Sequence, residues 1–317
     1  MSSVKYLVVS STIDYSSDLI CYELEKRGHS YLRINRDRFA NYKIIYSLEK
    51  NKLEISINNQ MYEILPENLE SVYFRAPVFL RTGKSYALEE QLYRSQWSAF
   101  IRNLIVFDKA RWLNHPVSTY QAENKLFQLK LAKEHGLEVP TTYTGNAMPQ
   151  EINIDRSFIV KSLDTALFYE NGSEMFTYSN IVNGRELMNS GLQYAPVIIQ
   201  ECLENKTDIR VTVIGNRLFA VNILKNGHQI DGDWRQTSSE ELNYMPIDLP
   251  CEIEQKILGL MKDLNLAFGG VDLALVDGKY YFIEVNPTGE WGWLVSTTSL
   301  PIDKAIVDWL DGGVFDE

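Results

Sequence analysis

Residues 269–291 read Gly269-Gly-Val-Asp272-Leu-Ala-Leu-Val-Asp-Gly-Lys-Tyr-Tyr-Phe-Ile-Glu284-Val-Asn286-Pro-Thr-Gly-Glu-Trp291. This stretch decides the predicted fold more than any other part of the chain. Two alternating apolar segments flank Asp277-Gly278-Lys279, a pattern that predicts a β-hairpin. We expect those three residues to form the loop, so that Val276 pairs with Tyr280.

Three polar side chains then gather on one face of the hairpin. The predicted register places Asp272 opposite Glu284, and Asn286 shares their face because side chains alternate along a strand. A two-residue loop would move Asp272 to the other face, so the prediction depends on the three-residue loop. Oxygen donors with no His or Cys nearby suit Mg²⁺, which usually binds together with the phosphates of a nucleotide. The alternative is an ordinary hairpin with a few polar positions. Glu284 lies in a strand of interior character, where an unpaired carboxylate is costly, and this favours a metal site.

The composition describes an acidic protein that is large enough for several packed layers. The chain has 317 residues, of which 45% are hydrophobic, and a net charge of −11. This charge argues against a nucleic-acid-binding protein or a membrane-surface protein. No run approaches the roughly 20 apolar residues of a membrane span, and no N-terminal stretch resembles a signal peptide, so we expect a cytoplasmic protein without a membrane partner.

The cysteines and histidines indicate no metal centre and no disulfide framework. The three cysteines are far apart and form no CxxC motif, which fits a reducing cytosol. The four histidines show no metal-ligand spacing. These residues are Cys21, Cys202, Cys251, His29, His115, His135 and His228.

Three regions of α/β and α+β character follow one another, namely residues 1–113, 114–196 and 197–317. The first contains no GxGxxG dinucleotide fingerprint. The apolar patterns predict strands over 5–10, 31–34, 42–48, 53–57, 71–75, 158–161, 197–203, 208–214 and 217–224. They predict helices over 18–27, 88–107, 122–135, 252–264 and 302–310.

Candidates for a nucleotide site precede the hairpin. Lys125 lies in a predicted helix and Lys161 at the end of a predicted strand, and two lysines can reach the phosphates of one nucleotide. Each alone is also typical of a solvated surface lysine, but Lys161 directly follows the apolar residues 158–160. The stretch Gln200-Glu201-Cys202-Leu203 has the character of a hinge whose backbone can bind an adenine edge in an apolar pocket.

Asp208 and Arg210 share one face of the strand over 208–214. An arginine on a sheet face within a cleft can stabilise negative charge as it develops. The alternative is a surface ion pair between the two residues.

The order of these features resembles the ATP-grasp superfamily of carboxylate–amine ligases. Two lysines, a hinge, Asp-x-Arg, a further arginine and Asp…Glu-x-Asn follow one another over roughly residues 114–295. Three local motifs are similar to those of the graspetide synthetases, the microviridin-type peptide macrocyclases, and less like glutathione synthetases or the glutamate ligases that tail ribosomal proteins. These motifs are Ser71-Val-Tyr-Phe-Arg-Ala-Pro77, Asp231-Gly-Asp-Trp-Arg235-Gln236 and Asn286-Pro-Thr-Gly-Glu-Trp-Gly-Trp293.

The resemblance implies an ATP-grasp fold that clamps ATP and Mg²⁺. Residues 1–113 would form an N-terminal pre-ATP-grasp domain, 114–196 a central subdomain, and 197–317 a C-terminal subdomain with the metal-binding hairpin. The implied nucleotide contacts are Lys125 and Lys161 to phosphates, Gln200, Glu201, Cys202 and Leu203 to adenine, and Asp208 to the nucleotide. The implied catalytic residues are Arg210 and Arg235, and the implied metal ligands are Asp272, Glu284 and Asn286. One departure concerns residues 162–173, where many members carry a glycine-rich loop and this chain has only Gly172, which leaves the closure of the lid open.

The implied reaction activates a carboxylate with ATP. Transfer of the γ-phosphoryl group to an Asp or Glu side chain makes an acyl phosphate, which a Ser or Thr hydroxyl or a Lys amine then attacks with release of phosphate. Two Mg²⁺ ions would neutralise the transferring group, while Arg210 and Arg235 would face the charge that moves. The sequence identifies no general base.

The implied substrate is a ribosomally made precursor peptide whose side chains become joined as macrocyclic esters or amides. Basic residues of the first region can attract an acidic peptide, and Arg75 of the Ser71–Pro77 motif is the candidate for direct contact. The basic residues are Arg33, Arg36, Arg38, Arg75, Arg81 and Lys84. Relatives suggest a homodimer.

Two other functions stay open. The first is an ATP-grasp ligase that joins a small carboxylic acid or an amino acid to an amine. The second is a non-catalytic nucleotide- or peptide-binding protein, against which stands the presence of every expected metal and phosphate position.

Overall fold

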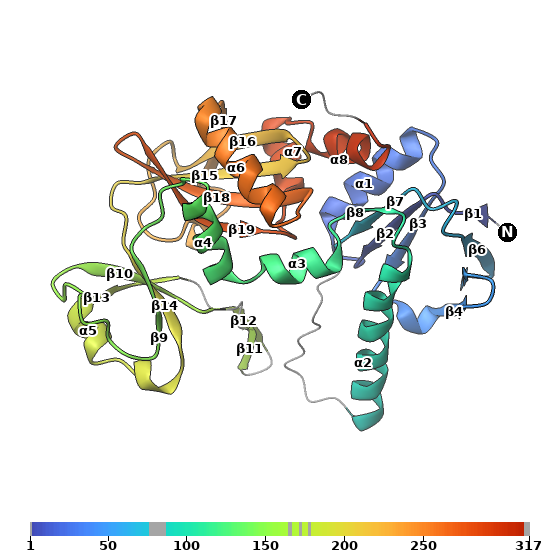
Figure 1. The fold of residues 1–317 in the computed structure, drawn as a ribbon, viewed down its shortest axis with the longest axis horizontal. Coiled ribbons are helices and arrows are strands. Elements are labelled where there is room, and N and C mark those ends of the chain that lie inside the picture. Colours follow the sequence, from blue (N-terminus) through green and yellow to red (C-terminus); the bar gives the residue numbers. More distant parts are fainter. Residues whose placement is uncertain (1, 76–86, 164–166, 171–172, 177–178, 314–317) are drawn as a thin grey trace.

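The computed structural model describes residues 2–75, 87–163, 167–170, 173–176 and 179–313. The strands of these residues form five sheets (Figure 1), which confirms the predicted mixture of α/β and α+β structure. Within the same residues no helix is both long and apolar enough to cross a membrane.

The N-terminal sheet, with the strand order β3-β2-β7-β8, is parallel throughout. All five side chains of β2 are buried, as expected for an inner strand of a parallel sheet that is covered on both faces. A second, outer sheet with the order β1-β6-β5-β4 packs beside it, and the long helix α2 extends away from both (Figure 1). The elements are β1 (Ser2–Ser3), β2 (Tyr6–Ser10), α1 (Tyr15–Lys26), β3 (Tyr31–Asn35), β4 (Tyr42–Ser47), β5 (Lys52–Ile57), β6 (Gln60–Ile64), β7 (Ser71–Phe74), α2 (Leu88–Asn103) and β8 (Arg111–Leu113).

The central sheet has the antiparallel order β13-β10-β14-β9. Helices α3 and α4 lead from the N-terminal sheet toward it, and the pair β11–β12 lies to the right of it in Figure 1. The elements are α3 (Pro116–Ala122), α4 (Lys125–Glu134), β9 (Thr142–Gly145), β10 (Ser157–Lys161), β11 (Leu167–Glu170), β12 (Ser173–Phe176), β13 (Asn180–Asn183), α5 (Gly184–Met188) and β14 (Val197–Glu201).

The large sheet has the antiparallel order β17-β16-β15-β18-β19. Val211 and Leu273 lie on the face that α4 and α6 cover, whereas Arg210 and Asp272 lie on the opposite face. The alternation therefore separates an apolar core from a polar surface within single strands. The elements are β15 (Thr207–Ile214), β16 (Arg217–Lys225), the 3-10 helix η4 (Trp234–Gln236), β17 (Leu242–Ile247), α6 (Cys251–Asp263), β18 (Phe268–Val276), β19 (Lys279–Asn286), α7 (Gly292–Thr298) and α8 (Ile302–Leu310).

The β18–β19 hairpin has the predicted pairing of its carboxylates but reaches it by a different route. The turn has two residues, Asp277 and Gly278, both with positive φ, and Val276 pairs with Lys279 rather than with Tyr280. The predicted three-residue loop was therefore wrong, because Asp-Gly supplies the two left-handed positions of a type I′ turn.

A β-bulge restores the register above this turn. Leu273 pairs with Phe282, but Asp272 pairs with Glu284, so Ile283 has no partner residue on β18. Phe282 belongs to the apolar core, whereas both Ile283 and Glu284 line the pocket described below. An extra residue on one strand thus moves the acidic side chain to the required face.

Other boundaries also differ from those predicted. The helix expected over 122–135 is the shorter α4, the preceding helix α3 was not predicted, and α2 ends at Asn103 before a 3-10 turn. The strands β6, β8, β9, β13 and β17 were not predicted. They are short or lie at sheet edges, where the apolar alternation is weak.

The division of the chain into domains stays a proposal. β14 forms hydrogen-bonded ladders with β9 and β10 of the central sheet. We therefore propose to place the second boundary after Glu201 rather than before Val197.

Candidate active site

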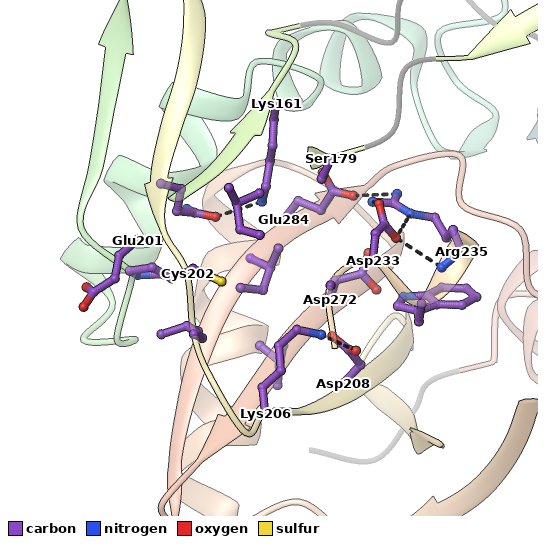
Figure 2. A pocket seen from close by; sticks show the side chains of 18 of the residues that line it. Lys161, Ser179, Glu201, Cys202, Lys206, Asp208, Asp233, Arg235, Asp272 and Glu284 are labelled. Carbon is purple, nitrogen blue, oxygen red and sulfur yellow. Dashed lines mark hydrogen bonds and ion pairs between the residues drawn. The ribbon is translucent and has the colours of Figure 1, made fainter. Parts of the chain in front are cut away.

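A pocket lies between the central sheet and the large sheet, and η4 closes one side of it. Figure 2 shows Lys161 reaching from β10 toward Glu284, with Asp233 and Arg235 on one side and Lys206 and Asp208 on another. The lining residues are Pro140, Ile159, Lys161, Ser179, Gln200, Glu201, Cys202, Leu203, Lys206, Asp208, Ile209, Gly232, Asp233, Trp234, Arg235, Asp272, Leu273, Ile283 and Glu284. The pocket thus gathers predicted site residues from β10, β14, β15, η4, β18 and β19.

The three predicted metal ligands lie together, with Asp272 and Glu284 lining the pocket and Asn286 beside them. Asn286 Nδ2 lies 3.3 Å from Asp272 Oδ2 and 3.4 Å from Glu284 Oε1. Both carboxylates are buried, with 8% of each residue exposed. The amide of Asn286 therefore bridges the two acids across the hairpin.

Cationic side chains from other elements surround Glu284. Lys125 Nζ, at the first residue of α4, lies 3.7 Å from Glu284 Oε2, and Arg235 Nη1 lies 3.3 Å from Glu284 Oε1. Arg235 is itself held by Asp233, which accepts from Nε at 2.9 Å and from Nη2 at 3.0 Å. Lys161 Nζ donates to Gln200 Oε1 at 2.8 Å.

These surroundings give the two acids different affinities for protons. Burial raises the pKa of Asp272 to about 6, although Arg210 opposes the rise. Burial would also raise the pKa of Glu284, but Lys125, Arg235 and Lys161 together lower it to about 2. Burial likewise lowers the pKa of the Lys161 ammonium, and Glu284 opposes that change. Glu284 is therefore the fixed negative charge of the site.

Arg210 is a buried cation with unused hydrogen-bonding capacity. Its Nε lies 3.1 Å from Asp272 Oδ1, and its guanidinium lies 5.9 Å from the ring of Trp234. Within the described residues, neither Nε nor Nη1 of Arg210, nor Oδ1 of Asp272, has an aligned hydrogen-bond partner. Buried polar atoms of this kind are costly unless a ligand satisfies them.

The predicted hinge lies along the opposite wall. Gln200 is buried, and its side chain donates to Thr142 Oγ1 at 2.9 Å while accepting from Lys161. Cys202 follows the end of β14 and also lines the pocket. Burial raises the pKa of Asp208, and the neighbouring Lys206, which forms an ion pair with it, opposes that rise.

The donor set fits a magnesium ion bound together with phosphate. Within the described residues, no three or more His, Cys, Asp or Glu side chains are grouped to hold a metal by themselves. Two carboxylates and one amide oxygen supply only part of the coordination that Mg²⁺ needs, and phosphate oxygens and water normally complete it. Asp272 Oδ1, which accepts no aligned hydrogen bond, suits a cation, and the N–H groups of Arg210 that donate none suit an anion. Rotation of the Asn286 amide would present its oxygen in place of its nitrogen.

Two supporting residues were not found from the sequence. Gln128 of α4 is buried, donates to Val285 O at 2.8 Å, and accepts from Val285 N at 2.9 Å. The Gln128 side chain therefore supplies the two hydrogen bonds that a neighbouring strand would give to Val285, which lies between Glu284 and Asn286 on the edge strand β19. Asp233, which orients Arg235, lies within a motif quoted above, but its own spacing carries no signal. A buried glutamine on a helix has no recognisable sequence pattern either.

The basic residues of the first region do not form one free patch. Arg75 is buried among partners that are described below, and Arg33 forms an ion pair with Asp18. Arg81 and Lys84 lie outside the described residues, as do Ala76 and Pro77 of the Ser71–Pro77 motif and part of the 162–173 segment.

The family described as the ATP-grasp domain matches residues 122–288, which is more than half of the chain. The chain belongs to the ATP-grasp family. The matched range includes every predicted phosphate and metal position, from Lys125 to Asn286. No curated protein matches this ATP-grasp chain.

Solved structures are similar over the whole length of this ATP-grasp protein. Macrocyclase MdnC from Microcystis aeruginosa MRC, bound with precursor peptide MdnA, is 27% identical with a TM-score of 0.81, and the match covers 98% of this chain and 100% of MdnC. Macrocyclase MdnB from the same organism is 26% identical with a TM-score of 0.71, and the match covers 100% of both chains. A Chryseobacterium gregarium RiPP-associated ATP-grasp ligase, in complex with ADP and a leader and core peptide, shares the fold at 24% identity and a TM-score of 0.81, over 99% of this chain and 98% of that one. The resemblance to peptide macrocyclases therefore includes the N-terminal sheets that lie outside the family match.

Proposed function

We propose that this protein is an ATP-dependent ligase that forms macrocycles in a ribosomally made precursor peptide. Asp or Glu side chains of the peptide would be activated as acyl phosphates and joined to Ser, Thr or Lys side chains as esters or amides. One observation carries the proposal: cations from two separate elements, α4 and η4, contact Glu284, in a chain that matches a peptide macrocyclase from end to end. The MdnC structure contains a precursor peptide, and we infer a partner of the same kind here.

The pocket divides into a nucleotide end and a reaction end. Ile159 and Ile209 supply apolar walls beside the hinge residues 200–203, which suits an adenine ring. Lys161 contacts Gln200 and Lys125 contacts Glu284, and both lysines would hold phosphate oxygens. Asp208 would contact the nucleotide on the same side.

Asp272, Glu284 and Asn286 would hold magnesium. Mg²⁺ bound there would neutralise negative charge on the phosphate groups. The N–H groups of Arg210 that donate no hydrogen bond would bind an oxygen of the phosphate or of the peptide carboxylate, and Arg235 would act beside them.

The carboxylate of the peptide takes the γ-phosphoryl group and ADP leaves. A hydroxyl or amine of the same peptide then attacks the acyl carbon, loses its proton, and displaces phosphate. Arg210 and Arg235 remain in place while the negative charge moves from the phosphoryl group to the acyl oxygen. Loss of one such donor typically costs on the order of 10²–10³ in rate.

The test uses candidate precursor peptides from the open reading frames that neighbour the gene of this protein, incubated with ATP and Mg²⁺ and analysed by mass spectrometry. We expect the loss of one water for each ring, and no loss with Glu284→Ala. An unmodified peptide under conditions in which ATP still binds would overturn the proposal. Phosphate release with a free amino acid would then identify a small-molecule ligase.

The proposal also includes a cellular location and an oligomeric state. The free thiols of Cys21, Cys202 and Cys251 are compatible with a reducing cytoplasm, where we place the protein. The homodimer expected from the resemblance stays a prediction, which sedimentation of the purified protein would test.

A further inference from the structure

Arg75 fastens the loop that follows Asn286 to the N-terminal sheet. It directly follows β7, and its Nη1 donates to the backbone oxygens of Thr288 and Gly289, each at 2.8 Å. Its Nη2 donates to Glu290 Oε1 at 2.6 Å. The Arg75 side chain is only 5% exposed, so its bonds to the two backbone oxygens are largely shielded from water, whereas the Glu290 side chain is 64% exposed.

The residues around Arg75 extend the same attachment. Asp14, the N-cap of α1, lies 3.3 Å from Arg75 Nε through its Oδ2 and also accepts from Ser10 and Ser17. Ser16 of α1 donates to Glu290 Oε2 at 2.9 Å and accepts from Gly292 N at 3.1 Å.

A third contact joins the two sequence motifs directly. Trp291 Nε1 donates to the hydroxyl of Tyr73 at 3.1 Å, and both side chains are buried. The motif at 71–77 and the motif at 286–293 therefore meet in space, although more than half of the chain separates them.

This loop determines where Asn286 can lie. Gly289 N donates to Asn286 O at 3.1 Å and closes a tight turn. A Cβ at Gly289 would lie 3.2 Å from Asn286 Cβ and 3.4 Å from Arg210 Nη1. The carbonyl that Arg75 binds thus belongs to a residue confined between the proposed metal ligand and the proposed catalytic arginine.

We propose that Arg75 is a positioning residue that sets the magnesium-binding geometry of Asn286 through the 287–292 loop. This inference rests on the proposed metal site of the ligase. Arg75 lies outside the range of the family match, so the N-terminal sheet would contribute to a site formed by the ATP-grasp region. A direct contact between Arg75 and the peptide, the role that the sequence suggested, would require these bonds to break.

The first experiment measures Mg²⁺-dependent ADP binding by calorimetry, without peptide. For Arg75→Gln we expect the Mg²⁺ concentration at half-saturation to rise by about 10- to 100-fold, the usual cost of losing a group that orients a metal ligand. ADP affinity in EDTA should change by less than about threefold, because Arg75 does not line the pocket. Arg75→Lys should recover only part of the loss, since one ammonium cannot reproduce the fork of the guanidinium.

Arg27→Gln is the matched control. Arg27 also joins the N-terminal region to the C-terminal part of the chain, through Asp308 at 2.9 Å and Asp311 at 3.0 Å, but it does not contact the loop. An unchanged Mg²⁺ dependence in Arg75→Gln, or an equal change in Arg27→Gln, would overturn the proposal. A raised peptide KM with normal Mg²⁺ dependence would instead return Arg75 to the peptide site.

A second measurement needs neither metal nor nucleotide. Amide hydrogen exchange of residues 286–292 should become faster in Arg75→Gln and stay at the wild-type rate in Arg27→Gln. If Arg75→Gln fails to fold, Glu290→Ala provides the test, because the Glu290 side chain is 64% exposed and its loss removes the contacts to Arg75 and Ser16. Neither measurement uses the peptide, so failed macrocyclisation and a failed positioning role give different results.

Discussion

Lys125 Nζ lies 3.7 Å from Glu284 Oε2, so the first residue of α4 contacts a pocket-lining side chain of the edge strand β19. The same ammonium donates to the backbone oxygen of Ser162 at 3.3 Å, which follows β10. One lysine therefore contacts both sheets that enclose the pocket. Its position at a helix N-terminus adds the positive end of the helix dipole to its own charge.

Glu284→Gln should weaken the binding of Mg²⁺ without weakening the binding of the nucleotide alone. The neutral side chain keeps the volume of Glu284 but no longer competes with phosphate for Lys125 and Arg235. We expect ADP affinity in EDTA to stay equal or to rise, while the Mg²⁺ dependence of binding weakens by at least about tenfold. Calorimetry with and without Mg²⁺ measures both. Glu252→Gln on the surface of α6 is the control. If ADP binding in EDTA were lost in Glu284→Gln but not in Glu252→Gln, Glu284 would not compete with phosphate for the two cations.

Gly270→Ala should displace Arg210 with little cost in stability. A Cβ at this position would lie 2.4 Å from Arg210 Nη1, and the end of that side chain can move. We expect ligase turnover to fall on the order of 10²-fold and the midpoint of thermal unfolding to change little. Gly145→Ala, where nothing lies within 4 Å of the added carbon, is the matched control. Wild-type turnover in Gly270→Ala would remove Arg210 from the reaction.

Gln128→Ala should destabilise the protein. The substitution leaves the N–H and the C=O of Val285 without partners at a buried position. Each such group costs about 1–3 kcal/mol, so we expect the free energy of unfolding to fall by about 2–4 kcal/mol in urea denaturation. Gln255→Ala on the exposed face of α6 should change it by less than about 0.5 kcal/mol. Equal values for the two variants would show that Gln128 does not support β19.

Cys202 should report occupation of the pocket. It lines the pocket, and burial raises the pKa of its thiol, so alkylation should be slow near neutral pH and accelerate at alkaline pH as the thiolate forms. MgATP should slow the alkylation of Cys202 by about tenfold or more, because the hinge becomes covered. The exposed Cys251 should react at the same rate with and without nucleotide. Peptide mass spectrometry after timed labelling distinguishes the two thiols, and equal protection of both would argue against nucleotide at the hinge.

Asp14 should make stability depend on pH in the acid range. Burial opposes its ionisation, but Arg75, Ser10 and Ser17 hold the pKa of its carboxyl below the ordinary value of 3.8. A lowered folded-state pKa gives stability that is present above the unfolded-state pKa and is lost as the pH falls through the folded-state pKa.

Asp14→Asn removes this titration and keeps an N-cap for α1. We expect the variant to be less stable than wild type by about 2 kcal/mol at pH 7, and the difference to shrink as the pH falls below 3.8. Urea denaturation at several pH values measures it. A difference that is independent of pH would mean that the charge of Asp14 does not contribute.

Much of the site could be read from the sequence because local patterns fix it. Lys161 ends an apolar strand, and Asp208 and Arg210 alternate with apolar neighbours, so period-two alternation places all three. The order of these residues along the chain resembles that of the ATP-grasp superfamily, and this resemblance assigned them to the same site as the hairpin. The structure brings these residues to one pocket or to its immediate border, while their individual roles stay predictions.

The remaining features depend on contacts between distant segments. The Asp-Gly turn and the bulge at Ile283 compensate for each other, and apolar alternation alone shows neither. Helix α3 has only seven residues, too few for a clear apolar period, and it was not predicted. Asn114 is buried and binds the backbone of Phe268 and Pro287 through its side chain, although its local sequence resembles a loop. Such partners become visible only when the chain is folded.

The contact between Arg75 and the 287–292 loop restricts which chimeric enzymes can work. A hybrid that takes its first hundred residues from one relative and the remainder from another would combine an arginine with a loop that did not evolve beside it. Transplanting the loop together with the N-terminal segment would keep the donor–acceptor pairs intact. The two segments should therefore be inherited as a unit, and a pair of hybrids with and without the matching loop would reveal this in their yield of folded protein.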